Sequence, residues 1–582
     1  MNGLIKRAFC LLLFFTASSA VSAQWKWYNP MDTGYPVIQN QGFTGEISKT
    51  YVRLPDRAKG VVRDDVWNLS RNSSGLALHF YSNAPEIKIR YTVSGGFNMP
   101  HMPSTGVSGL DLYSINSCGQ WRNCSGNYSF SDTVSYYYGI KTKDQFHNRG
   151  FEYRLFLPLY NSVKWMEIGV PDGYELEFIP ASPEKPIVLY GTSIAQGACA
   201  SRPAMAWGNI LQRSLDYPLI NLGFSGNGRL EKEVLDFVSE PDARLYILDC
   251  LPNLTNRSEL EVDSLVTAAV KQLRKSHPDT PILLVEHAGF SNALTDSTQY
   301  NAIERANSGS RKAYEKLSAE NTKELYYLSR GELGFPADAW VDYVHPSDLG
   351  MQQQAKAVEK KVRQILNIPI GNISTTIPVT QRREPHNYEW QARHRAVLEQ
   401  ISNNPPKSII IGNSITHFWG GEPEHPNKFG KQSWDEVMRP AGFINLGYGW
   451  DRIENALWRV YHGEMDGYKA GKIVVMIGTN NLSENSDAEI TAGLQFLLSA
   501  IAERQPQAEI KVIGILPRRD MEERVKRLNS QIKSMAEKKG YTFTDAGTLL
   551  LTKGGKIDET LFLDGLHPNE NGYKKIARKI AE

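Results

Sequence analysis

The sequence has almost no net charge and no long apolar run beyond its first residues. Its 582 residues include 65 Lys and Arg against 63 Asp and Glu, a formal net charge of +2. Lys6 and Arg7 lie in the first 23 residues, which contain no acidic residue, so the remainder carries 63 basic and 63 acidic residues. This balance argues against nucleic acid, a polybasic membrane tether or a strongly acidic partner.

The first 23 residues, MNGLIKRAFCLLLFFTASSAVSA, are the one strongly apolar stretch. Two basic residues precede an apolar run of about a dozen residues, and small residues follow up to Ala23. This order is typical of a secretory signal peptide cleaved after Ala23. Because the run is shorter than a bilayer span of about 20 residues, we expect a protein secreted across the inner membrane, periplasmic or extracellular, without membrane insertion.

Cysteine is scarce, with five residues in the chain. Cys10 lies inside the apolar run and not after a cleavage site, which argues against a lipoprotein. The other four form an even set in an exported chain, where disulfides are allowed, and Cys118 and Cys124 flank the short loop CGQWRNC that they could close. Their spacing fits no common zinc pattern, and apart from two Asp-x-x-His pairs no His or Asp cluster has ligand spacing. We therefore predict neither a metal nor a cofactor.

Residues 24–182 have the pattern of a β-sandwich, of jelly-roll type. Short alternating runs such as LALHFYS and EIKIRYTV lie between clusters of Gly, Pro and Asn. The segment is rich in aromatic residues, which either stack on sugar rings or fill the core of the sandwich: Trp25, Trp27, Tyr28, Trp67, Tyr136, Tyr137 and Tyr138.

From residue 183, apolar strand-like runs alternate with helical stretches, which is the rhythm of a parallel sheet covered by helices. Residues 183–370 contain PIVLYG, YPLINLG, ARLYILDC and TPILLVE. Residues 371–398 lack periodicity and are predicted as a linker. The rhythm returns in residues 399–582, with SIIIGNS, FINLGYG, KIVVMIGTN and EIKVIGILP. We therefore predict three domains, the last two being copies of one another.

One short motif occurs in both copies, as DYVHPSDLG at 342–350 and as DGLHPNENG at 564–572. Each motif has Asp three residues before His, so the carboxylate can hydrogen-bond the imidazole and support the imidazolium formed in general-base catalysis. A single such pair is more often incidental. These two, Asp342 with His345 and Asp564 with His567, are the last of four blocks that recur in the same order.

The series begins with Ser193 in VLYGTSIAQG and Ser414 in IIIGNSITHF. Each Ser follows a buried-looking strand and opens a predicted helix, which places its hydroxyl at the carboxyl edge of a parallel sheet. The Gly-containing turns INLGFSGNG and INLGYGWDR come next, followed by Asn253 and Asn480, whose side-chain amides can donate to an oxyanion. The copies are offset by 221 residues at Ser, 227 at Asn and 222 at His, a register that chance would not keep.

These blocks resemble the SGNH (GDSL-like) hydrolase family. The resemblance rests on Ser193, Gly226, Asn253, Asp342 and His345 in the first copy, and on Ser414, Asn480, Asp564 and His567 in the second. It implies two flavodoxin-like three-layer α/β/α domains and a metal-free serine esterase mechanism. In that mechanism Ser attacks an ester carbonyl, His carries the proton and Asp orients His. The Gly N–H, the Asn side chain and the Ser N–H form the oxyanion hole.

The two copies resemble different groups within this family. GVSGLDLY at 106–113, together with GTSIAQGACASRPAMAW and NLGFSGNG, is similar to a bacterial group with a β-domain before the hydrolase domain. That likeness implies a β-domain that borders the first active site. INLGYGWDRIENALWRV, VVMIGTNN and RQPQAEIKVIGILPR resemble the catalytic subunits of the intracellular platelet-activating-factor acetylhydrolases.

The sequence departs from the family pattern at two places. Thr192 and Asn413 stand where the family has Asp before the nucleophile, a position outside the triad. Trp450 replaces the oxyanion-hole Gly of the second copy, so its backbone N–H remains as a donor while the indole narrows the pocket and favours a small acyl group. The first and third strands of this fold are neighbours, so Cys199 and Cys250 are either two buried thiols or a disulfide that braces the nucleophile turn; we expect the disulfide.

We therefore predict an exported serine esterase that removes O-acetyl or other small acyl groups from carbohydrates such as O-acetylated sialic acids or polysaccharides. An acetylated glycan is the expected partner, and the difference between Gly226 and Trp450 predicts different specificities. Two alternatives remain, a lipase or phospholipid acylhydrolase and a glycan-binding protein with an inactive hydrolase domain. The aromatic residues near the second site either stack on a sugar face or pack in the core: Trp419, Trp434, Tyr448 and Trp450.

Overall fold

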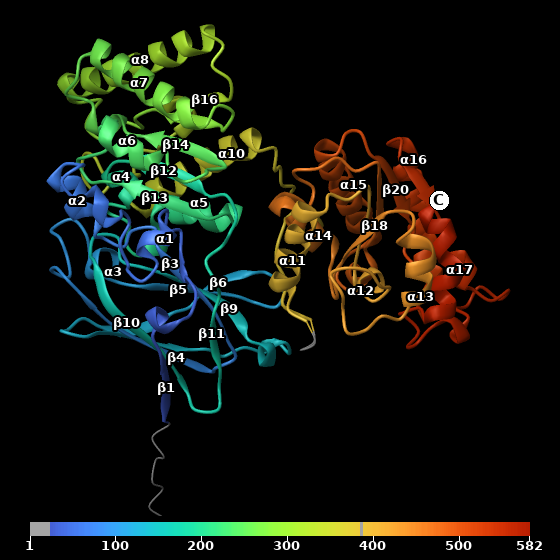
Figure 1. Ribbon diagram of the computed structural model, residues 1–582. Helices are drawn as coiled ribbons and strands as arrows, with labels where there is room; N and C mark the ends of the chain where they lie inside the picture. The colour runs from blue at the N-terminus through green and yellow to red at the C-terminus, as the bar shows by residue number, and fades with distance from the viewer. Residues whose placement is uncertain (1–23, 385–387) are drawn as a thin grey trace, which may run out of the picture.

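In the computed structural model, which describes residues 24–384 and 388–582, the chain forms three bodies (Figure 1). A β-domain packs below a first α/β domain, and a second α/β domain lies beside both in the view of Figure 1. The predicted signal peptide, residues 1–23, lies outside the described residues. Among the described residues, no helix combines the length and the apolar character that crossing a membrane requires.

The β-domain consists of two antiparallel sheets with one shared core. Alternate residues of a strand point to opposite faces, and the inward set of β4, which includes Ile87, Ile89 and Tyr91, packs with Phe80 and Leu155 of the other sheet. The first sheet has the order β1 (Trp25–Tyr28), β10 (Val163–Pro171), β4 (Glu86–Val93), β8 (Val134–Gly139) and β7 (Gly126–Ser129). The second has the order β11 (Leu176–Phe178), β3 (Ala77–Ser82), β9 (Phe151–Phe156), β5 (Asp111–Ile115) and β6 (Trp121–Asn123), with β2 (Ile38–Gln39) paired to β3.

The first α/β domain has a parallel five-stranded sheet between two layers of helices. Its strand order is β13 (Leu219–Gly223), β12 (Ile187–Gly191), β14 (Leu245–Asp249), β15 (Ile282–Val285) and β16 (Leu325–Leu328). Numbered along the chain this is 2-1-3-4-5, the flavodoxin-like order. One face packs against α5 (Trp207–Leu215) and α10 (Asp348–Ile365). The other packs against α6 (Lys232–Val238), α7 (Glu259–Ser276) and α8 (Ser297–Ala319).

The second α/β domain repeats this order. Its strands are β18 (Phe443–Gly447), β17 (Ser408–Gly412), β19 (Lys472–Met476), β20 (Glu509–Ile513) and β21 (Thr542–Thr544). The main helices around them are α11 (Trp390–Asn403), α14 (Ile453–Arg459), α15 (Asp487–Arg504), α16 (Glu522–Lys538) and α17 (Glu570–Ala581). The predicted fold class, a β-sandwich followed by two three-layer α/β/α domains, is confirmed in this architecture.

The described parts of the segment predicted as a linker, residues 371–384 and 388–398, are packed against the rest of the molecule. They contain the short helix η6 (Ser374–Thr376) and the first part of α11. Gln381, Arg383 and Glu384 are buried, and the N–H of Arg382 donates to the carbonyl of Ser117 in the β-domain at 2.9 Å.

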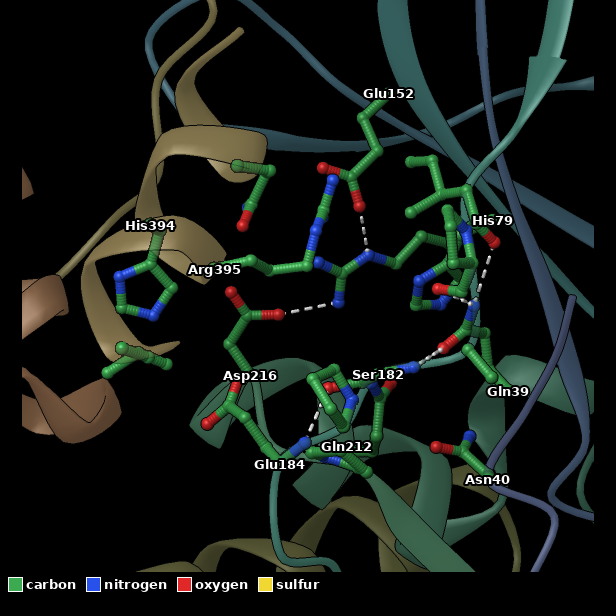
Figure 2. A pocket seen from close by; sticks show the side chains of 18 of the residues that line it. Gln39, Asn40, His79, Glu152, Ser182, Glu184, Gln212, Asp216, His394 and Arg395 are labelled. Carbon is green, nitrogen blue, oxygen red and sulfur yellow. Dashed lines mark hydrogen bonds and ion pairs between the residues drawn. The ribbon is translucent and has the colours of Figure 1, made fainter. Parts of the chain in front are cut away.

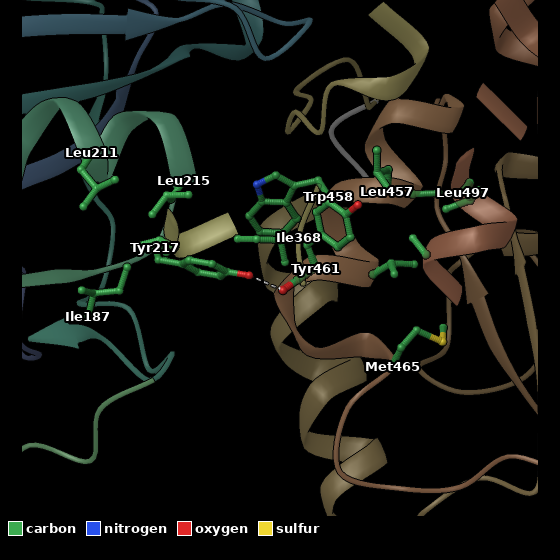
Figure 3. Packing of buried hydrophobic residues seen from close by; sticks show 14 of the residues in the cluster. Ile187, Leu211, Leu215, Tyr217, Ile368, Leu457, Trp458, Tyr461, Met465 and Leu497 are labelled. Carbon is green, nitrogen blue, oxygen red and sulfur yellow. Dashed lines mark hydrogen bonds between the residues drawn. The ribbon is translucent and has the colours of Figure 1, made fainter. Parts of the chain in front are cut away.

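The two α/β domains share an apolar contact that continues from one core to the other (Figure 3). Leu215 of α5 and Ile368 face Trp458 of α14. At the edge of this contact the Tyr217 hydroxyl donates to the carbonyl of Tyr461 at 2.6 Å. The contact therefore holds the two α/β domains against each other.

A small cavity lies where the three domains meet (Figure 2). Its volume is about 90 Å³. Arg154 of the β-domain is one of the residues that line it, and it pairs with Glu152 at 2.7 Å and with Asp216 at 2.5 Å. None of the predicted catalytic residues lines this cavity, which is therefore part of the domain junction and separate from both candidate active sites.

The expected Cys199–Cys250 disulfide is wrong. All four cysteines of the described residues, Cys118, Cys124, Cys199 and Cys250, are free thiols. Cys199 belongs to the apolar cluster on one face of the first parallel sheet, and Cys250 belongs to the cluster on the opposite face. Neighbouring strands do not bring the two sulfurs together, because the sheet itself lies between them. The loop-closing bridge Cys118–Cys124 is absent as well.

Candidate active sites

The two candidate serines occupy the same structural position in their domains. Ser193 follows β12 and begins the short helix α4 (Ser193–Gln196), and Ser414 follows β17 and begins α12 (Ser414–His417). The preceding residue caps each helix: the Thr192 hydroxyl accepts from the N–H of Ile194, and the Asn413 side chain accepts from the N–H of Ile415. The departures from the family's Asp therefore keep a side-chain oxygen where a helix N-cap needs one.

In the first domain, the structure brings Ser193, His345 and Asp342 together as a hydrogen-bonded triad. Ser193 Oγ lies 2.9 Å from Nε2 of His345, and Nδ1 of His345 lies 2.8 Å from Oδ2 of Asp342. The other carboxylate oxygen accepts from the backbone N–H groups of Val344 and His345, both at 2.7 Å. This geometry aims the imidazole at the hydroxyl of Ser193, a residue that is only 5% exposed.

The second domain contains the same triad, formed by Ser414, His567 and Asp564. Ser414 Oγ lies 2.9 Å from Nε2 of His567, and Nδ1 of His567 lies 2.7 Å from Oδ2 of Asp564. Oδ1 of Asp564 accepts from the N–H groups of Leu566 and His567, at 2.9 Å and 2.8 Å.

Both carboxylates are held in the charged form. Burial would raise the pKa of Asp342, but the hydrogen bonds from the side chain and backbone of His345 lower it, and the net shift is downward. Asp564 behaves in the same way: burial would raise its pKa, but hydrogen bonds from the backbone and side chain of His567 lower it, and the net shift is downward. Each Asp can therefore stabilise an imidazolium at neutral pH.

The predicted oxyanion donors of the first site lie in two adjacent turns. Gly226 follows β13 with φ at +70°, a left-handed conformation that glycine adopts at little cost. Asn253 ends the short helix η5 (Leu251–Asn253), and its Oδ1 accepts from the N–H of Gly228 at 3.0 Å. Because this bond uses the amide oxygen, the NH₂ group of Asn253 remains the donor for an oxyanion.

Trp450 takes the place of Gly226 in the second site and keeps its backbone conformation. Its φ is +67°. A left-handed conformation costs a residue with a side chain roughly 1–2 kcal/mol, so the neighbours of this turn must hold it. Asn480 contributes to this, because its Nδ2 donates to the carbonyl of Asp451 at 2.9 Å. One amide hydrogen of Asn480 therefore supports the turn, and the other remains for an oxyanion.

A buried asparagine in each copy was missed by the sequence analysis. Asn221 donates to the carbonyl of Ala195 at 2.7 Å and accepts from the N–H of Gly223 at 2.8 Å. Asn445 makes the equivalent bonds to Thr416 and Gly447, at 2.7 Å and 2.8 Å. These residues fix the helix turn behind each serine. The repeated letters INLG in both copies carried the signal, because a polar residue recurs in the middle of a buried strand.

Three of the four aromatic residues near the second site belong to the core. Trp419, Trp434 and Tyr448 are buried, whereas the side chain of Trp450 is 44% exposed. The Trp450 ring meets the ring of Phe146, from the β-domain, at 5.7 Å and nearly edge-on. Of this group, Trp450 is therefore the side chain that remains open to a ligand.

Several aromatic rings of the β-domain already carry a cation on one face. Lys88 lies 3.9 Å above the ring of Trp25, and Arg90 lies 4.0 Å above the ring of Trp27. Tyr136 and Tyr138 are buried in the sandwich. These contacts favour the interpretation of the β-domain aromatics as structural residues.

His101 of the β-domain extends to the first site. Its ring stacks on the ring of His345 at 5.6 Å, and candidate ligand atoms of His101, Cys199 and His345 lie within 4.8 Å of one another. A soft metal ion could bind there only by breaking the bond from His345 to Ser193, because the other ring nitrogen is held by Asp342. Burial raises the pKa of the Cys199 thiol to about 12, which also opposes the thiolate that a metal ion needs.

Comparison with known proteins places each domain. The GDSL-like Lipase/Acylhydrolase family matches residues 184–363 and, through a second profile, residues 410–575, and residues 25–176 match the N-terminus of Esterase_SGNH_hydro-type. A crystallised GDSL-like lipase from Bacteroides ovatus ATCC 8483 is 30% identical, with a TM-score of 0.55, and the match covers 60% of this chain and 100% of that one.

Two curated relatives are platelet-activating factor acetylhydrolase IB subunits. The human subunit alpha2 is 27% identical over 198 residues, which is 33% of this chain and 82% of the relative. The bovine subunit alpha1 is 27% identical over 196 residues, which is 33% of this chain and 80% of the relative. The resemblances predicted for the two copies are confirmed by these matches.

Proposed function

Because the chain belongs to the GDSL-like (SGNH) hydrolase family and is a tandem esterase of that family, we propose that it releases acetyl or other small acyl groups from carbohydrates outside the cytoplasm. The observation that carries the proposal is the presence of two complete Ser–His–Asp triads, each at the carboxyl end of a parallel sheet. Chemistry at both serines is part of the proposal.

In the proposed reaction the serine oxygen bonds the ester carbonyl carbon while its proton moves to Nε2 of the histidine. The Asp carboxylate stabilises the imidazolium through Nδ1. The carbonyl oxygen becomes an oxyanion that accepts from backbone N–H groups and from the Asn amide. Collapse breaks the ester C–O bond, the histidine returns its proton to the departing sugar hydroxyl, and water releases the acyl group from serine by the same steps.

Three features support a small acyl group on a sugar. The indole of Trp450 lies at the oxyanion turn, where it takes space from a long acyl chain. Its exposed part offers a flat face to a sugar ring. The platelet-activating factor relatives are acetylhydrolases by name. Export rests on the predicted signal peptide at residues 1–23.

The test is acetate release from a panel of acetylated glycans by the parent chain, Ser193→Ala, Ser414→Ala and the double variant. Removing the only active nucleophile lowers kcat on the order of 10⁶-fold in a serine hydrolase. We expect each single variant to lose a different part of the panel and the double variant to lose all of it. Acetate release by the double variant would overturn the nucleophile assignment.

A paired assay with p-nitrophenyl acetate and p-nitrophenyl octanoate separates the proposal from its alternatives. Preference for acetate supports the deacylase. Preference for octanoate would instead support a lipase, and no turnover of either ester by the folded chain would support a binding protein.

A further inference from the structure

The oxyanion turn of the second site, Gly449–Trp450–Asp451, needs external support that its counterpart in the first domain does not. Gly226 holds its φ of +70° without a side chain, whereas Trp450 holds +67° with one. Such a conformation persists in a residue with a side chain when the surroundings determine it.

The segment before α11 supplies that support through hydrogen bonds to the backbone of the turn. The carbonyl of Gly449 accepts from Nε2 of Gln381 at 3.0 Å and from the hydroxyl of Tyr388 at 2.7 Å. The carbonyl of Trp450 accepts from Nη2 of Arg383 at 3.1 Å. We call residues 379–384 and 388–390 the strap, because they hold two successive carbonyls of the turn.

The strap also holds the residue that follows Trp450. The indole N–H of Trp390 donates to Oδ1 of Asp451 at 2.7 Å, and Nε of Arg459 donates to Oδ2 at 2.9 Å. Gln381, Arg383, Trp390 and Asp451 are all buried. Buried hydrogen bonds of this kind allow few alternative arrangements of the turn.

The other side of the strap is fixed to the β-domain. Nε of Arg382 donates to the carbonyl of Gly150 at 2.9 Å, and Nη2 of Arg149 donates to the carbonyl of Tyr388 at 2.7 Å. The guanidinium of Arg382 stacks on the ring of Tyr81 at 3.4 Å. At Gly119, an added Cβ would lie 2.2 Å from the carbonyl of Thr380, so the β-domain loop and the strap are in direct backbone contact.

We propose that the strap is a positioning element of the second active site, through which the β-domain sets the oxyanion turn around Trp450. Gln381, Arg383 and Tyr388 are its positioning residues. They act by holding the N–H of Trp450 where the oxyanion forms, and they do not touch the substrate. The inference rests on the proposed esterase activity at Ser414.

The test uses full-length chains with Ser193→Ala, so that p-nitrophenyl acetate is turned over at the second site alone. Arg383→Ala should lower kcat about tenfold with little change in KM, because a misplaced donor weakens transition-state binding more than substrate binding. Tyr388→Phe removes one hydroxyl, keeps the ring, and should lower kcat by a smaller factor. Arg395→Ala, an exposed arginine on α11, is the matched control and should leave kcat unchanged.

Glycine at position 450 provides the decisive comparison. Glycine adopts a positive φ without support, so Arg383→Ala should lower kcat less than twofold when added to Trp450→Gly. An equal loss in both backgrounds would overturn the proposal, because the arginine would then act on something other than the turn. Unchanged kcat in the single variant Arg383→Ala would overturn it as well.

Hydrogen exchange separates failure of this inference from failure of the proposed function. Peptides that cover residues 447–452 should exchange faster in Arg383→Ala than in the parent, and in Arg395→Ala at the parent rate. If the Ser193→Ala chain does not hydrolyse the ester, the proposed activity at Ser414 fails, while the exchange rates still decide whether the strap holds the turn. Equal exchange in Arg383→Ala and the parent would overturn the inference.

Discussion

In the two α/β domains, arginines from different parts of the chain support the equivalent strand of the parallel sheet. Arg53 of the β-domain donates through Nη1 to the carbonyls of Asn221 and Gly223, at 3.2 Å and 2.7 Å. Arg393 of α11 donates to the equivalent carbonyls of Asn445 and Gly447, at 3.1 Å and 2.8 Å. In both domains an arginine from outside the parallel sheet supports the strand that leads into the oxyanion turn.

The turns themselves differ, and the difference shows how one backbone shape can have two causes. In the first domain glycine at position 226 permits the shape, and Arg63 of the β-domain bonds only the side chain of the next residue, Asn227, at 2.6 Å. In the second it depends on contacts from the strap, because position 450 is tryptophan. A repeated motif therefore does not imply a repeated set of supports.

The largest expected effect tests whether the two triads are equivalent. Asp342→Asn in a Ser414→Ala chain and Asp564→Asn in a Ser193→Ala chain should each lower kcat on the order of 10⁴-fold, because Asn favours the wrong imidazole tautomer. Steady-state kinetics with p-nitrophenyl acetate measure both losses. A large loss in one domain and none in the other would break the comparison, since only one triad would then do general-base chemistry.

The next effect tests whether position 450 sets acyl length. In a Ser193→Ala chain, Trp450→Gly should raise the ratio of butyrate to acetate turnover about tenfold. Changes of this size are typical when a hydrophobic pocket gains room for an additional methylene. Trp450→Phe is the control, because it keeps an aromatic ring and should change the ratio less. An unchanged ratio in Trp450→Gly would show that the indole does not border the acyl group.

A third prediction concerns a buried carboxyl of the first domain whose equivalent position in the second domain holds methionine. Asp249 ends β14, where the second domain has Met476, and each pairs with the glycine that ends the neighbouring strand. Burial raises the pKa of Asp249 to about 7, although the hydrogen bond from Gln354 lowers it in part. Between about pH 4 and pH 7 the folded chain therefore holds a proton that the unfolded chain has lost, so the free energy of unfolding falls as pH rises through this window.

Asp249→Asn should flatten this dependence, because the amide cannot ionise and still accepts from Gln354. Between pH 5 and pH 8 the parent should lose about 3 kcal/mol at most through this group, because roughly two pKa units separate pH 5 from the folded pKa, and Asp249→Asn should not show this loss. Denaturant unfolding at pH 5 and pH 8 measures it, with Met476→Leu as the matched control. Equal pH dependence of the parent and Asp249→Asn would show that Asp249 is not the group responsible.

The smallest expected effect concerns the thiols. A chain without residues 1–23 should titrate four thiols in denaturant without reductant, as the structure has them free. Cys199→Ser should then change the first-site kcat less than twofold, since the thiol is protonated and takes no part in the proposed reaction. A count of two thiols would show that one disulfide is present and would contradict the structure.

Much of this architecture could be predicted because its signals are local. The runs PIVLYG and SIIIGNS identified the strands before each serine, and the Asp-x-x-His spacing placed each Asp and its His on one turn. The second strand's buried asparagines, Asn221 and Asn445, had a readable signal in the repeated INLG and were overlooked.

The contacts between domains could not be predicted in this way. Phe146 meets Trp450 across 304 residues of chain, and His101 meets His345 across 244. No periodicity or spacing links such residues, because their approach depends on how whole domains pack. The cysteine error has the same origin, since the adjacency of two strands does not say on which face a side chain lies.

The apolar contact between Leu215, Ile368 and Trp458 has a practical consequence for anyone who wishes to divide this chain. A cut near residue 370 would leave two fragments, each with an exposed apolar surface that the other domain covers in the intact chain, and we expect such fragments to aggregate. The second fragment would also lose its connection to the β-domain. The tandem is therefore better engineered by inactivating one serine at a time than by expressing its halves separately.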